Sequence, residues 1–333
     1  MNLRALFAAG IAAAAIAAPV AATAVSAAAG TPAARPAALE GTPAPASMAS
    51  IGGIVPALGT QVRHNVFAPA VNGCREPRCN LGYHRGPVMH APRIYLVFWG
   101  PKWRTSGADY KYITRFYRGL GAPRDNWLKI TTQYGDRGGH PRVTGSLVAR
   151  IYMDRARPPR TVSPDTLAIL ATGVANRFRV NRANSDIVIL SQSGTCFSDG
   201  FAGSCGHPHT PGYCGWHGAA TNGVLVTNDP YQPDAGRLCG VNWLSSGGNS
   251  RYQGFSVVGG HEFAESITDP RPDSGWIDWN DVRITGGEIG DKCAWGEPVP
   301  GVFVPKGFVS LPTGRFAMQS LWSNKQRGCK MAS

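Results

Sequence analysis

The sequence predicts an α/β fold, in which a mixed sheet is flanked by helices and carries long disulfide-stapled loops. Apolar runs rich in β-branched residues, typical of buried strands, occur at Arg93–Gly100, Asp186–Ser191 and Gly223–Thr227. Segments with apolar residues three or four apart, typical of amphipathic helices, precede the second of these runs. Long stretches rich in Gly, Cys and Asn follow it. Strands that alternate with helices favour a sheet covered by helices.

The N-terminal part has the pattern of an exported chain. Residues 1–27 contain Arg4, an apolar Ala/Ile/Val run and small-residue cleavage sites, which predicts a secretory signal peptide. Residues 28–58 are rich in Ala, Pro, Gly and Thr, and we expect a flexible linker there. Residues 59–333 show neither a second linker nor a repeat, which favours a single domain. No other stretch has the roughly 18 apolar residues of a membrane span.

The first predicted strand is followed by a helix. Arg93–Gly100 is apolar and aromatic and stops at a Gly-Pro pair, as a buried central strand would. In Asp109–Leu120, the side chains of Tyr112, Phe116 and Leu120 recur every four residues. They therefore lie on one face of a helix that packs on this strand.

A strand-like patch and a second helix come next. Arg142–Tyr152 is rich in β-branched residues, and Gly145 marks a bulge or turn within it. Ser163 is a suitable N-cap, with Pro164 just inside the helix that continues to Phe178. The two shorter apolar strands follow.

Eight cysteines, all after the linker, fit an oxidising compartment. We expect disulfides, with Cys74–Cys79 and Cys293–Cys329 as the preferred pairs. A zinc–cysteine site is the weaker alternative, because no paired Cys-x-x-Cys occurs.

The chain is basic, with 33 Lys and Arg against 20 Asp and Glu and a net charge of +13. Charge attraction would allow an anionic cell-wall polymer as a partner, but a solvated Arg-rich surface is the favoured interpretation. The arginines are scattered and no recognition motif accompanies them, so a specific nucleic-acid partner is not indicated. The sequence does not indicate the oligomeric state.

A short helix that ends at Pro270 carries the main functional signal. His261 and Glu265 are four residues apart and so lie on one face of this helix, where both could bind one metal ion. Glu262 stands beside them as a candidate general base. The pattern is that of the zinc-peptidase helix His-Glu-x-x-His, with Glu in place of the second His.

Further ligands are expected from a Gly-bracketed loop before Cys293. Glu288 and Asp291 lie in this loop, and a downstream carboxylate completes the site of several zinc peptidases. The predicted metal ligands are therefore His261, Glu265, Glu288 and Asp291, with zinc as the cofactor. Calcium, held by oxygen ligands in a structural role, is the alternative, and the region supplies further acids for it: Asp273, Asp278 and Asp281.

Four other residues compete for roles in this site. Asp269 reads first as part of a helix-ending turn, and His217 lies in a Cys-Gly-Trp-His-Gly segment that we expect to be a loop. His207 and His209 read as exposed loop residues. A serine hydrolase is disfavoured because the chain has no Gly-x-Ser-x-Gly elbow.

Several segments in order resemble the phosphate-induced protein 1 (EXORDIUM-like) family, over roughly Gly82 to Cys329. They are Tyr83–Met89, Ile94–Trp103, Asp125–Trp127, Cys214–Gly218 and Thr268–Pro270. The resemblance implies kinship with plant proteins that are secreted, wall-associated and without an established catalytic activity. Residues 287–293 are similar to a bacterial branch of the family that carries His-Glu-x-x-Glu.

Two functions remain open from the sequence. The first is an exported metal-dependent hydrolase that acts on peptides, with His261, Glu265 and a loop acid as ligands and Glu262 as base. The second is a non-enzymatic extracellular or wall-associated protein, as the resemblance implies, in which the acids support the fold or bind calcium.

Overall fold

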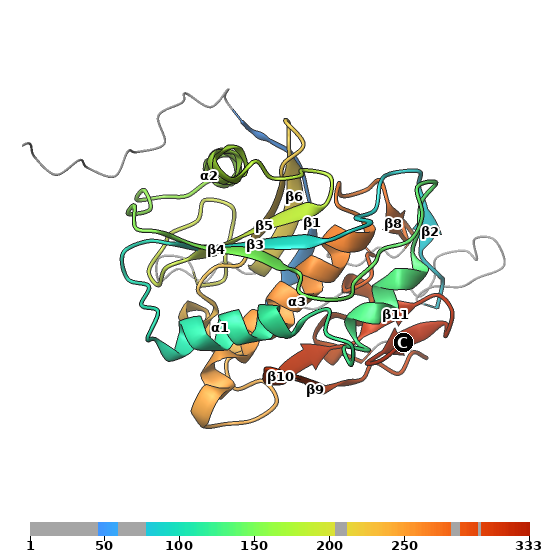
Figure 1. The fold of residues 1–333 in the computed structure, drawn as a ribbon. Coiled ribbons are helices and arrows are strands. Elements are labelled where there is room, and N and C mark those ends of the chain that lie inside the picture. Colours follow the sequence, from blue (N-terminus) through green and yellow to red (C-terminus); the bar gives the residue numbers. More distant parts are fainter. Residues whose placement is uncertain (1–45, 59–77, 204–211, 281–286, 299–300) are drawn as a thin grey trace, which may run out of the picture. The chain divides into compact units, whose positions relative to one another are not determined.

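A computed structural model describes residues 46–58, 78–203, 212–280, 287–298 and 301–333 (Figure 1). The expected signal peptide and most of the expected linker lie outside these residues. Within the described part, no helix combines the length and the apolar character that a membrane crossing requires.

The predicted α/β fold with a mixed sheet is confirmed. Six strands form the main sheet in the order β1-β6-β7-β5-β3-β4. The strands β3, β4, β5 and β7 are parallel to one another, whereas β6 is antiparallel to both β7 and β1. Their bounds are β1 Met48–Pro56, β3 Arg93–Trp99, β4 Val148–Asp154, β5 Ser185–Ser191, β6 Tyr213–Ala220 and β7 Leu225–Asn228.

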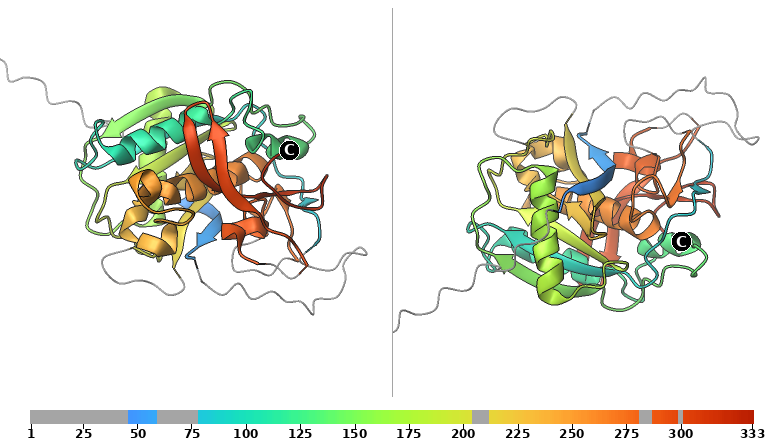
Figure 2. Two further views of the ribbon diagram at one scale, coloured as in Figure 1. Left: turned by 90° about the horizontal axis from the view of Figure 1, so that it is seen from below. Right: turned by 90° about the horizontal axis from the view of Figure 1, so that it is seen from above.

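Helices cover both faces of this sheet (Figures 1 and 2). Helix α2 (Pro164–Phe178) lies on one face, and α1 (Ala108–Gly119) and α3 (Gln253–Thr268) lie on the other. The alternation along the strands matches this arrangement. Leu96 and Val188 belong to the core under α1 and α3, whereas Val97 and Ile187 belong to the core under α2.

Short pairs of strands complete the fold, together with two disulfides whose cysteines both lie in the described residues. The pairs are β2 (Gly82–Tyr83) with β8 (Trp276–Ile277), β9 (Lys306–Leu311) with β10 (Gly314–Gln319), and β11 (Leu321–Ser323) with β12 (Gly328–Lys330). The predicted Cys293–Cys329 bond is confirmed, and a Cys214–Cys239 bond joins it. Cys79 is also disulfide-bonded, but its predicted partner Cys74 lies outside the described residues.

Two segments differ from the sequence prediction. Met48–Pro56 was expected within the flexible linker but forms β1, because its few apolar residues pair with β6 and pack into the core under α2. Tyr213–Ala220 was expected to be a loop but forms β6, which is buried throughout. Small residues lower the local strand propensity of both segments, and pairing with their neighbours outweighs it.

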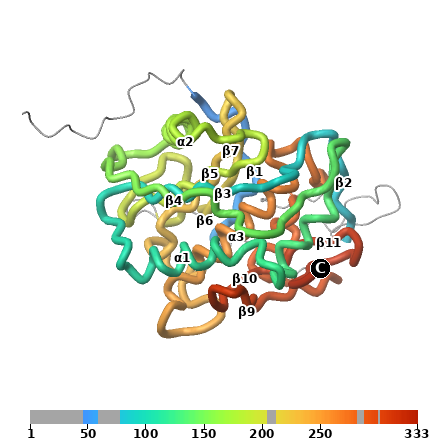
Figure 3. Tube along the Cα trace, in the orientation of Figure 1, coloured from blue at the N-terminus to red at the C-terminus, as the bar shows by residue number. Residues whose placement is uncertain are grey.

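Helix α3 is unusual because all 16 of its residues are buried. It packs between the main sheet and β10, with β1 beside it, so that segments distant in sequence meet there (Figure 3). Gly259 and Gly260 permit this close packing. A Cβ at Gly259 would collide with the hydroxyl of Tyr117, and one at Gly260 would crowd Met318 and Phe116. The acidic residues of α3 are therefore inside the protein.

We predict that Asp186→Asn changes how stability depends on pH. Burial raises the pKa of Asp186 from 3.8 to about 7, despite hydrogen bonds from Thr227 and Ser266. The protonated carboxyl therefore contributes stability below pH 3.8, and this contribution is lost as pH rises through about 7. The asparagine variant lacks this loss, so it should gain up to about 4 kcal/mol relative to the parent between pH 4 and pH 8. Urea unfolding at both pH values measures this difference, and identical pH dependence in the two proteins would contradict it.

Candidate metal centre

Helix α3 brings three of the predicted site residues together. His261, Glu262 and Glu265 are each 0% exposed. Nε2 of His261 lies 2.9 Å from Oε1 of Glu265, as expected for residues four apart on a helix. The predicted ligand pair is therefore adjacent in the fold, although it is buried rather than open to solvent.

The loop before Cys293 supplies the other two predicted ligands. Oδ1 of Asp291 lies 3.4 Å from Nε2 of His261. The backbone N–H groups of Gly290 and Asp291 donate hydrogen bonds of 3.1 Å to Oε1 of Glu265, and Glu288 donates its N–H to Oδ2 of Asp291. A Cβ at Gly290 would collide with the imidazole of His261 and the carboxylate of Glu265, so only glycine allows this approach.

Two anchors hold this loop in place. The Cys293–Cys329 disulfide ties the 3₁₀ segment η6 (Asp291–Gly296) to strand β12. Trp322 on β11 donates its backbone N–H to the carbonyl of Ile289 at 2.8 Å. The C-terminal strands therefore fix the position of both loop acids against α3.

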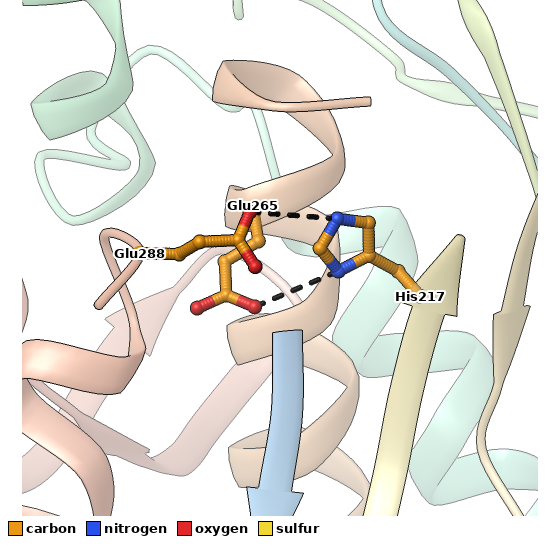
Figure 4. Close-up of side chains that lie close together, drawn as sticks. All are labelled: His217, Glu265 and Glu288. Carbon is orange, nitrogen blue, oxygen red and sulfur yellow. Dashed lines mark ion pairs between the residues drawn. The ribbon is translucent and has the colours of Figure 1, made fainter. Parts of the chain in front are cut away.

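His217 on β6 completes the site, although the prediction left it out of the ligand set. Its Nδ1 lies 3.3 Å from Oε2 of Glu262 and 3.6 Å from Oε2 of Glu265, and its Nε2 lies 3.7 Å from Oε1 of Glu288 (Figure 4). Nε2 is also 3.0 Å from the carbonyl oxygen of Asp269. If Nε2 carries the proton and donates to that carbonyl, Nδ1 presents its lone pair to the acids.

A turn signal could have placed His217 on a strand. Asn222-Gly223 lies between the His217 segment and the apolar run that forms β7, and Asn-Gly between two strand-like runs is typical of a hairpin. The pairing of β6 with β7 sets His217 opposite Thr227. The glycines of the His217 segment favour a loop instead, and for this reason the strand was not predicted.

We call His217, His261, Glu262, Glu265, Glu288 and Asp291 the buried cluster. Two groups of donor atoms in it could hold a metal ion: His217, Glu265 and Glu288, and His261, Glu265 and Asp291. In each group the ligand atoms lie within 4.8 Å of one another. Glu265 belongs to both groups.

Several donor atoms of the cluster lack a hydrogen bond from the described part of the chain. They are Oε1 of Glu262, Oε2 of Glu265, Oε1 of Glu288 and Nδ1 of His261. Nε2 of His261 forms ion pairs with Glu265 at 2.9 Å and with Asp291 at 3.4 Å. Buried polar atoms left in this way are costly, and a cation among them would remove that cost.

The ionisable groups of the cluster also favour a bound cation. Burial and neighbouring carboxylates raise the pKa of Glu262 and of Glu288 well above their ordinary value, and that of Glu265 to about 7. Burial lowers the pKa of His217 to about 4, which leaves a neutral imidazole that can act as a ligand. Burial also opposes a charge on His261, but the carboxylates of Glu265 and Asp291 outweigh it and raise its pKa. Four carboxyl groups around two imidazoles favour a bound cation.

The side chains of the other candidates make their contacts elsewhere or lie outside the described residues. The carboxylate of Asp269 accepts hydrogen bonds from the backbone of Ser274 and Gly275, as a helix-ending turn requires. Asp278 pairs with Lys292 at 2.6 Å, and Asp273 is exposed, so neither joins the cluster. His207, His209 and Asp281 lie outside the described residues.

Strand β1 covers the cluster. A Cβ at Gly53 would collide with Oε2 of Glu265 and Nδ1 of His217, so the backbone of β1 lies directly against both side chains. The backbone of Val55 donates a hydrogen bond to the carboxylate of Glu262. Figure 4 shows part of this strand beside Glu265 and His217.

Comparisons of the chain with protein-family models, curated proteins and solved structures give no match. The EXORDIUM-like resemblance therefore stays a prediction.

We predict that Glu265→Gln abolishes metal binding and removes the stabilisation that the metal gives. Glu265 is the residue shared by both donor groups, so its loss affects either of them. Elemental analysis of the purified protein should find metal in the parent and none in the variant. Chelation should lower the thermal midpoint of the parent and leave that of the variant unchanged.

Asp125→Asn serves as the matched control, because Asp125 is a buried carboxylate that accepts hydrogen bonds from Gly121 and Leu128 outside the cluster. It should lose stability and keep the metal. Equal metal content in the parent and Glu265→Gln would contradict the site.

Proposed function

We propose that this protein is an exported metal-dependent hydrolase of peptides, with zinc held by His261, Glu265 and Asp291 and with Glu262 as general base. The observation that carries the proposal is the combination on α3 of a metal-ligand pair with an adjacent carboxylate that hydrogen-bonds to none of these ligands. The signal pattern of residues 1–27 and the disulfides support export.

The donor set favours zinc over calcium. Imidazole nitrogen is a good ligand for zinc, whereas calcium takes six to eight oxygen ligands. The cluster offers two imidazoles, whereas Asp278 pairs with Lys292 and Asp273 faces solvent. When bound, zinc would lower the pKa of a water molecule and polarise a substrate carbonyl.

Glu262 is suited to accept a proton in such a site. Its pKa is raised by burial and by the acids around it, and a nearby cation would bring that pKa back toward neutrality. Oε2 of Glu262 lies 3.3 Å from Nδ1 of His217, whose lone pair can accept a hydrogen bond from Glu262 once this carboxylate has taken up the proton. Glu288 lies on the other side of this imidazole, at 3.7 Å from its Nε2.

The complete burial of the cluster supports a second candidate function. In it the ion is structural, and the protein is a non-enzymatic extracellular or wall-associated protein, as the EXORDIUM-like resemblance implies. A structural ion would hold α3, β6 and the loop before Cys293 together without any open ligand position. Metal binding alone therefore does not separate the two functions, and hydrolysis does.

We predict that Glu262→Gln keeps the metal and lowers the rate of peptide hydrolysis by about 10²–10⁴-fold, the usual contribution of a general base. The assay uses a peptide library at pH 7 with products identified by mass spectrometry. It is run on the intact chain and on a chain cut after Leu58, because β1 covers the cluster. Metal-containing protein that hydrolyses no peptide in either form would contradict the hydrolase and favour the structural ion.

A further inference from the structure

The contacts of β1 with the cluster are made by its backbone. Gly53 lies against Glu265 and His217, and the backbone of Val55 donates to Glu262. These three cluster residues are the shared metal ligand, the proposed base and the histidine beside it. An extended chain thus crosses the proposed reaction centre with its main chain toward the reacting groups.

The pairing of β1 is that of an added edge strand. It is the terminal strand of the main sheet and runs antiparallel to β6, with Gly52 opposite His217 and Val55 opposite Gly215. The register shifts between Gly52 and Val55, so the strand is bulged where it passes the cluster. Main-chain pairing with a sheet edge, plus pockets for a few side chains, is a common way to bind an extended peptide.

The two ends of β1 are held by contacts that a peptide ligand could also make. Near one end, the indole of Trp295 donates to the carbonyl of Pro56 at 2.7 Å. At the other, the N–H of Met48 donates to Asp165 at 2.9 Å. The side chain of Val55 is fully buried, whereas Ala49 is exposed. Most of these contacts are made with the backbone of β1, so they do not depend on its side chains.

We propose that the edge of β6 is the substrate groove for an extended peptide, and that β1 occupies this groove as a displaceable strand of the same chain. The groove requires glycine at the position of Gly53, because any Cβ there meets Glu265 and His217. This inference rests on the proposed function and adds its substrate class: an extended peptide with glycine over the metal centre.

The test uses the full chain with a recognition sequence for a specific protease inserted after Leu58. After cleavage, a fluorescent peptide with the sequence of Met48–Pro56 is added and its binding is followed by anisotropy. A peptide with Gly53→Val should bind about 100-fold more weakly, since its side chain collides with the cluster. A peptide with Ala49→Val, changed at the exposed position, is the matched control and should bind as the parent peptide does.

Peptide hydrolysis is measured on the same samples. Loss of the cut strand should raise hydrolysis at least about tenfold, and an excess of the parent peptide should lower it again. Far-UV circular dichroism reports whether the cut protein stays folded.

Four outcomes would overturn the inference. A cut strand that never exchanges, or whose loss unfolds the protein, would make β1 an ordinary structural strand. Equal binding of the Gly53→Val peptide would remove the glycine requirement. Glycine-dependent exchange without metal-dependent hydrolysis would refute the hydrolase itself, and with it the role of the groove for a substrate. Hydrolysis that is the same before and after cleavage would leave the hydrolase standing and refute the groove alone.

Discussion

Glu265 lies fully buried on α3, and its two carboxylate oxygens face different groups of side chains. Oε1 meets His261 and the backbone N–H groups of Gly290 and Asp291, whereas Oε2 meets His217 and the backbone of β1. A carboxylate in such a place is unfavourable unless it is hydrogen-bonded and balanced by positive charge. The surrounding fold supplies the hydrogen bonds, and a metal ion would supply the charge.

Segments that are distant in the sequence supply the groups around Glu265. Strand β6 contributes His217, and the Cys293–Cys329 disulfide fixes the loop that contributes Glu288 and Asp291. A side chain added at Gly53 or at Gly290 would collide with residues of the cluster. A site assembled from four separate segments depends on all of them, so its metal binding and the stability of the fold should be coupled.

The sequence could predict the part of this site that is local. The spacing of His261 and Glu265 placed them on one helix face, and the glycines around residue 290 indicated a loop that approaches it. The strands β3 and β5 and the helices α1 and α2 were likewise predictable, because periodicity and the Ser163 cap are local signals. The structure confirms the fold class that they indicated.

What depends on pairing between distant segments could not be predicted in this way. His217 belongs to a glycine-rich strand whose partners are β1 and β7, and β1 belongs to a stretch whose composition is that of a linker. Neither segment has a strong strand propensity of its own. Each forms a strand because it pairs with a neighbouring strand, and the local sequence does not show this pairing. The burial of α3 on every side is a similar case. Its glycines and small residues are weak helix formers, but they allow close packing against Tyr117 and Met318.

Both candidate functions require a metal ion among these side chains. Diffraction data from crystals of the protein, collected above and below the zinc absorption edge, locate such an ion directly. We predict one anomalous peak about 2.0–2.2 Å from Nε2 of His261 and from oxygens of Glu265 and Asp291. A cluster without a peak, in which protonated carboxyl groups hydrogen-bond to one another and to the imidazoles, would contradict it.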